Sequence, residues 1–143
     1  MSNFSDFIGG GGSASFPTIF LHNSQTWVPP QDGNIMIHVI GAGGSGGGWN
    51  STPQSGAAGG YCRKNSLAVT TSGSFTVVVG AGGASSIGSY VAGTAGGTTT
   101  VAGTGLSSTL TATGGAGGAL QSTGFSTGGT ASNGDVNYAG GRG

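Results

Sequence analysis

Glycine is the residue that most constrains this chain, because it supplies 35 of the 143 residues and gathers in runs. It has no side chain to bury, and it loses more conformational entropy on ordering than any other residue. Disordered chains usually combine low hydrophobicity with a high net charge. Here three Lys/Arg balance three Asp/Glu, so the formal net charge is zero. The chain is therefore expected to order through dense backbone hydrogen bonding, within itself or with other chains.

The glycine runs alternate with short segments that are rich in Val, Ile and Thr, which is the composition of β-strands. Three of these segments run directly into glycine, at Gly41, Gly80 and Gly114, so one structural unit recurs. No segment offers ten residues of helical periodicity and Glu is absent, so we expect no α-helix. Strands are predicted over residues 35–40, 61–69, 74–79, 98–102 and 108–113, and residues 25–28 lead into the turn of a first β unit, 25–41.

Two interpretations of the glycine runs are open. Isolated Gly/Ser tracts are typically flexible linkers. Runs embedded between strands can instead form left-handed polyglycine II helices, with three residues per turn, that pack side by side and bond to one another. We expect such helices in at least part of 41–48, 80–88 and 114–143. The predicted fold class is all-β, a short-stranded β-sandwich or layered β unit beside packed polyglycine II helices.

Residues 1–24 differ from the rest of the chain, because they hold four of the six phenylalanines. We divide the chain into this aromatic leader, 1–24, and a glycine-rich fibre domain, 25–143. Such a leader is either a docking segment for a partner or the first strand of the domain, and docking on a particle is favoured. The docking candidates are Phe4, Phe7, Ile8, Phe16 and Phe20.

The leader lacks the basic start and apolar stretch of a signal peptide, and no run reaches the roughly 20 apolar residues of a transmembrane helix. We therefore expect synthesis in a cytoplasm, release without a cleaved signal, and no insertion into a membrane.

The motifs for enzymatic chemistry are weak. Residues 41–46 match the dinucleotide fingerprint G-x-G-x-x-G, yet Pro53 and the preceding glycines do not open a helix, and no acid follows at the required distance. His38 lies within a predicted strand, and the carboxylates are scattered singly, which does not suit acid–base catalysis. Cys62 is the only cysteine, so it has no disulfide partner and no Cys-rich metal site. We expect no enzyme activity, cofactor or metal.

The segments between glycine runs are better functional candidates. Those at 49–55, 84–91, 119–127 and 132–138 each hold one aromatic residue beside Asn, Ser, Thr or Gln. Rigid rings beside hydrogen-bonding groups are typical of recognition surfaces. The alternative is that each ring caps the core. The receptor-contact candidates are Trp49, Asn50, Tyr90, Phe125 and Tyr138.

The order of these elements resembles the glycine-rich domains of bacteriophage tail fibres and fibre-tip adhesins. The same pattern is similar to glycine-rich extracellular regions of some animal receptors. Five segments carry the resemblance across about 25–118, namely 26–29, 37–44, 59–64, 75–83 and 111–118. The leader has no counterpart in it, and the chain reaches Gly143 without an evident closing strand.

The phage resemblance implies a structural virion fibre or spike, assembled with itself as a homotrimer and with other tail or head proteins. It also implies that loops attach the particle to a host surface glycan or outer-membrane protein. With only three basic residues, a nucleic-acid partner is not expected. Two rivals remain. One is an ice-binding protein, since polyglycine bundles can display flat faces of Thr and Ala. The other is an extracellular-matrix glycine-rich protein, which should carry a secretion signal.

Overall fold

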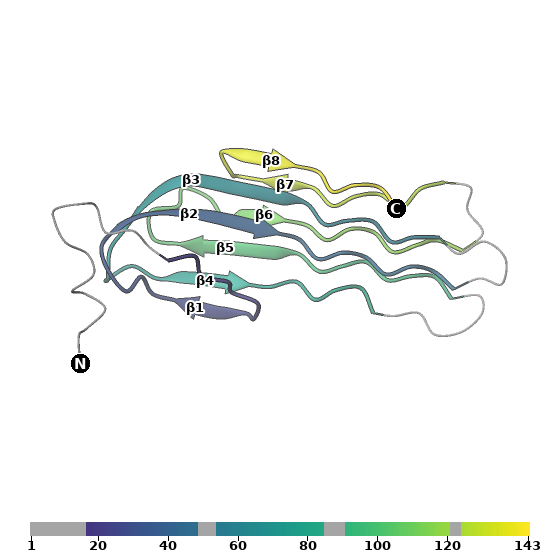
Figure 1. The fold of residues 1–143 in the computed structure, drawn as a ribbon, viewed down its shortest axis with the longest axis horizontal. Helices are drawn as coiled ribbons and strands as arrows, with labels where there is room; N and C mark the ends of the chain where they lie inside the picture. The colour runs from purple at the N-terminus through teal and green to yellow at the C-terminus, as the bar shows by residue number, and fades with distance from the viewer. Residues whose placement is uncertain (1–16, 49–53, 85–90, 121–123) are drawn as a thin grey trace.

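The computed structural model describes residues 17–48, 54–84, 91–120 and 124–143, and within them the chain forms two regions. Figure 1 shows a β-sandwich at one end and a set of nearly parallel extended segments that continue from its strands to the other end. The strands are β1 (Gln25–Trp27), β2 (Gly33–Ile40), β3 (Tyr61–Val69), β4 (Phe75–Val78), β5 (Thr99–Gly103), β6 (Leu110–Ala112), β7 (Ala131–Ser132) and β8 (Val136–Tyr138). The described residues contain no α-helix, so the all-β prediction is confirmed.

Two antiparallel sheets form the sandwich. The larger has the order β1-β4-β5-β6-β7, and the smaller has the order β2-β3-β8. Alternate side chains of a strand point to opposite faces, so each sheet directs every second residue inward. In β3 the buried positions include Cys62, Leu67 and Val69, and a register shift against β2 between Lys64 and Leu67 lets Cys62 and Leu67 face the same side. In β4 the buried positions are Phe75 and Val77. With Val39, Val101, Leu110 and Ala112, these residues form one hydrophobic core between the sheets.

The expectation that the chain lacks a closing strand is wrong. β7 pairs with β6, β8 pairs with β3, and together they complete one edge of each sheet. The interval 132–138 is therefore the end of β7, a turn and β8, where a loop was predicted. The turn has Asn133 at a φ of 66°, a conformation that Asn adopts more readily than most residues. The dipeptide Asn133-Gly134 is a hairpin signal that would have located these strands, although both are short.

Beyond the strands, the glycine-rich segments pack into a single bundle, which we call the glycine bundle. Its hydrogen bonds repeat every third residue. Gly41, Gly44 and Gly47 donate their N–H groups to Gly60, Ala57 and Gln54, over 2.8, 2.9 and 2.9 Å. This period is that of polyglycine II, in which backbone groups bond to neighbouring helices. The glycine bundle consists of residues 41–48, 54–60, 80–84, 91–98, 113–120, 124–130 and 139–143.

A second set of backbone hydrogen bonds shows that the segments of the glycine bundle are not arranged as a single sheet. Ala42, Ser45 and Gly48 donate to Gly97, Thr94 and Val91, which belong to a different neighbour of the segment 41–48. The same segment accepts bonds from a third neighbour, because Gly115 and Gly118 donate to Ala42 and Ser45. One segment thus contacts neighbours in several directions around its axis, and the packing of polyglycine II helices that the glycine runs predicted is confirmed.

Glycine is required where the segments approach one another closely. A Cβ atom built on Gly44 would lie against the Ala116 carbonyl, and one on Gly114 would lie against the carbonyl of Gly96. Both neighbouring groups are backbone, so they cannot move aside as a side chain would. At Gly43, one residue from Gly44, the nearest atom to such a Cβ is the Ala57 oxygen at 3.8 Å, an ordinary van der Waals contact. The need for glycine is therefore positional within a run.

Candidate functional site

The end of the glycine bundle that lies away from the sandwich is where the chain enters and leaves three intervals, 49–53, 85–90 and 121–123. The flanks of these intervals are bonded to one another. Gly47 N–H bonds to the Gln54 carbonyl at 2.9 Å, and Gly48 forms a β-bridge with Val91. The Thr94 hydroxyl donates to the Ala84 carbonyl at 3.1 Å. We call this region the free end of the bundle.

The flanks of the intervals present apolar side chains to solvent at the free end. Val91 and Leu120 are exposed, and Phe125 is 74% exposed. The position of Phe125 is set by its neighbour Ser126, whose buried hydroxyl donates to the carbonyls of Ser55 at 2.8 Å and Gly117 at 3.1 Å. An exposed phenyl ring on a hydrogen-bonded backbone offers contact area with little further loss of conformational entropy.

The predicted receptor-contact residues do not all come together. Phe125 lies near the free end, whereas Tyr138 lies in β8 on the sandwich. The Tyr138 ring stacks on that of Tyr61, with 6.2 Å between the ring centroids and an interplanar angle of 19°. The assignment of Tyr138 to a loop like that of Phe125 is therefore wrong. Trp49, Asn50 and Tyr90 lie outside the described residues.

Of the predicted docking residues, Phe20 is described and is exposed beside the sandwich. Phe4, Phe7, Ile8 and Phe16 lie outside the described residues.

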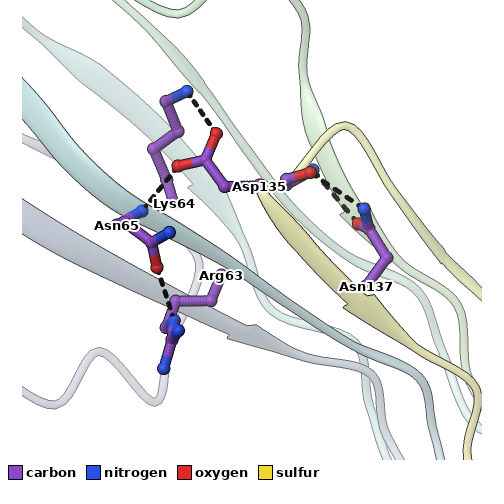
Figure 2. Close-up of polar contacts among 6 residues, drawn as sticks. Arg63, Lys64, Asn65, Asp135 and Asn137 are labelled. Atoms are coloured by element: carbon purple, nitrogen blue, oxygen red, sulfur yellow. Dashed lines mark hydrogen bonds and ion pairs between the residues drawn. The ribbon is translucent and has the colours of Figure 1, made fainter.

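A polar cluster connects β3 to the hairpin of β7 and β8 (Figure 2). Asp135 accepts a bond from the Lys64 ammonium at 2.7 Å and another from the backbone N–H of Asn65 at 2.8 Å. The Arg63 Nε–H donates to Asn65 Oδ1 at 2.8 Å. Asn137 bonds to both backbone groups of Gly134 across the turn. The cluster holds three of the six charged residues of the chain, and the bonds of Asp135 to Lys64 and Asn65 join the hairpin to β3.

The Lys64 hydrogen bond, followed by that of the Asn65 backbone, holds the pKa of the Asp135 carboxyl below its usual value. Because the folded-state pKa is the lower one, this pairing stabilises the hairpin above the ordinary Asp pKa, and the stabilisation is lost as pH falls through the folded-state value. We expect Lys64→Met to move the Asp135 titration to higher pH, measured by NMR of the side-chain carboxyl. Arg63→Met, which removes a more distant charge, should move it less. Identical titrations in the wild type and Lys64→Met would contradict the pairing.

His38 and Cys62, the residues considered for catalysis, lie on the neighbouring strands β2 and β3. The His38 ring nitrogen Nδ1 lies 2.9 Å from the Tyr61 hydroxyl on the outer face of the sheet. Cys62 is fully buried, and this burial raises the pKa of its thiol, which disfavours the reactive thiolate. Within the described ranges, no group of three or more His, Cys, Asp or Glu side chains could hold a metal ion. In that same part of the chain, no helix is long and apolar enough to cross a membrane.

Comparison with known proteins gives one family. A family model described as a glycine-rich domain matches residues 19–143, which is most of the chain. No curated protein and no solved structure matches the chain significantly.

Proposed function

We propose that this chain, which belongs to the glycine-rich domain family, is a structural fibre or spike protein of a phage particle that attaches it to the host through the free end of the bundle. The observation that carries the proposal is that the described flanks of three chain intervals, 49–53, 85–90 and 121–123, lie together at that end of the bundle. The described N-terminal residues, from Pro17 to Ser24, lie instead along the sandwich. The molecule thus has two distinct ends, as a protein between a particle and a surface requires.

The bundle suits the role of a stiff spacer. An eight-residue polyglycine II segment extends about 25 Å at about 3.1 Å per residue. Its backbone groups bond to neighbouring segments, so bending one segment strains the others. No buried side-chain polar atom in the described ranges lacks a hydrogen-bond partner, which is consistent with a well-ordered assembly. The bonds between segments thus fix the relative positions of the described residues that flank the three intervals.

The composition of the intervals supports a glycan or outer-membrane protein as the partner. Trp49 and Tyr90 bring aromatic rings, and Asn50 with the neighbouring Ser and Thr residues brings hydrogen-bonding groups. Aromatic rings give large contact areas on which sugars stack, while amides and hydroxyls bond to sugar hydroxyls. Self-association as a homotrimer and assembly with other tail or head proteins belong to the same proposal, as does location in the virion.

The test compares binding of the full chain to a panel of bacterial cells, purified lipopolysaccharide and outer-membrane vesicles. We expect the triple variant Trp49→Ser, Tyr90→Ser, Phe125→Ser to lose at least about tenfold in affinity, because aromatic residues dominate many interfaces. Tyr138→Ser removes an aromatic residue from the sandwich and is the matched control. It should bind as the wild type does.

Two results would contradict the adhesive part. One is full binding by the triple variant, and the other is an absence of wild-type binding to every probe in the panel. Thermal unfolding of each variant shows whether the fold is retained.

A further inference from the structure

One edge of the smaller sheet is open. β2 is an outer strand of the order β2-β3-β8, and in the described ranges no strand pairs with its other side. The Gly41 N–H bonds to Gly60, so the alternation along a strand directs the Val39 amide toward β3 and those of His38 and Ile40 toward the open edge. Exposed edge strands usually carry charged residues that prevent pairing with another strand. β2 carries none.

An apolar groove of about 790 Å³ follows this open edge. Its floor includes Trp27, Phe75 and Val77 of the larger sheet, because three strands cannot cover the inner face of five. β2 forms one wall and residues 17–21 form the other. At the mouth of the groove, the side chains of Met36 and Ile40 are 54% and 65% exposed. β2 therefore carries apolar side chains on its outer face as well as on the face toward the groove.

The two walls run in the same direction. β2 runs toward the glycine bundle, which it enters at Gly41. Residues 17–24 also run toward the bundle, because Ser24 accepts a hydrogen bond from the Val79 N–H, 2.9 Å away, at the bundle end of β4. β1 then returns antiparallel to β4. A chain segment that reversed direction just before residue 17 would therefore lie antiparallel to both walls.

We propose that residues 2–8 of the same chain fold back through the glycines at 9–12 and occupy this groove as the fourth strand of the smaller sheet. Four consecutive glycines permit such a reversal. Residues 2–8 include Phe4, Phe7 and Ile8, and their one charged residue is Asp6. A strand of seven residues spans about 23 Å, which is close to the length of β2.

The covalent connection favours this occupant over a separate chain. Pro17 lines the groove, and the proposed strand is joined to it by only eight residues, 9–16. A segment tethered over such a distance has a local concentration near the millimolar range, well above that of a dissolved partner. The proposal does not depend on host attachment. It makes the leader part of the sandwich, which is the alternative to its being a docking segment.

Amide hydrogen exchange tests the proposal directly. We expect the His38 and Ile40 amides to exchange at least about 100-fold more slowly in the full chain than in a variant that lacks residues 2–12, because a paired edge amide opens only when its strand separates. The Val39 amide, which faces β3, is the internal control and should exchange equally in both proteins. The full-length variant Phe4→Ser, Phe7→Ser, Ile8→Ser should lose the same protection, whereas Ser2→Ala, Ser5→Ala should keep it.

Three outcomes would overturn the proposal. The first is rapid exchange of His38 and Ile40 in the full chain. The second is slow exchange that the deletion leaves unchanged. The third is protection that rises with protein concentration while light scattering shows a doubled mass, which would assign the edge to a second copy. If the deletion also accelerates exchange at Val39, the triple serine variant decides, since it keeps the chain length.

Discussion

Gly44→Ala is expected to destabilise the protein by about 3 kcal/mol or more, because its new Cβ would meet the backbone carbonyl of Ala116. The two segments can only separate, which strains the hydrogen bonds from Gly44 to Ala57 and from Ala57 to Ala116. Natural domains are stable by roughly 5–15 kcal/mol, so this loss is a large share of the total. Thermal unfolding should show a midpoint lower by about 6–12 °C for a chain of this size.

Gly43→Ala is the matched control, since it makes the same chemical change one residue away in the same run. Its Cβ would find the nearest atom at 3.8 Å, and Gly43 is exposed. We expect a change within about 0.5 kcal/mol in the free energy of unfolding, because alanine fits at this position and restricts the unfolded chain. Equal destabilisation by the two variants would mean that general glycine flexibility matters, and would contradict the close packing of the bundle.

Phe75→Ala is expected to cost about 3–5 kcal/mol in the free energy of unfolding. The Phe75 side chain is only 1% exposed and lies 5.7 Å from the Trp27 ring, centroid to centroid. Its removal takes the largest fully buried side chain from a core that has few large residues, since much of the chain is glycine. Denaturant unfolding followed by the fluorescence of the two tryptophans, Trp27 and Trp49, would measure the loss.

Phe125→Ala supplies the comparison for this second prediction. The residue is 74% exposed, so its truncation removes little buried surface and should change stability by no more than about 0.5 kcal/mol. Comparing the two variants separates the contribution of the sandwich core to the free energy of unfolding from that of the free end. If Phe75→Ala unfolds with the wild-type midpoint, the bundle alone would set the stability, and the sandwich core would contribute little.

Much of the architecture could be predicted from the sequence. All five predicted strands overlap observed ones, because Val-, Ile- and Thr-rich segments bounded by glycine and turn residues have few other conformations to adopt. The two strands at the end of the chain were missed for a physical reason. β7 has two residues and β8 has three, too few to show alternation, and only Asn133-Gly134 marks the turn between them.

The candidate site was harder to predict than the fold. Trp49, Tyr90, Phe125 and Tyr138 appeared equivalent, since each is an aromatic residue among polar neighbours between glycine runs. Only the pairing of β8 with β3 separates Tyr138 from the free end and places it against Tyr61. The ion pair of Lys64 with Asp135 joins residues far apart in the sequence, so no local motif predicts it.

The amino-acid sequence by itself determined that this protein is built of short strands and glycine-rich segments, because glycine content and strand propensity act over a few neighbouring residues. The tertiary structure decided which glycines are indispensable, as Gly44 and Gly43 show, and which edge of the sandwich stays open. The reason lies in the bonding. Polyglycine II segments have no internal hydrogen bonds, so they bond to segments that are distant in the sequence. Whether a position needs glycine therefore depends on how closely a backbone carbonyl of such a segment approaches it.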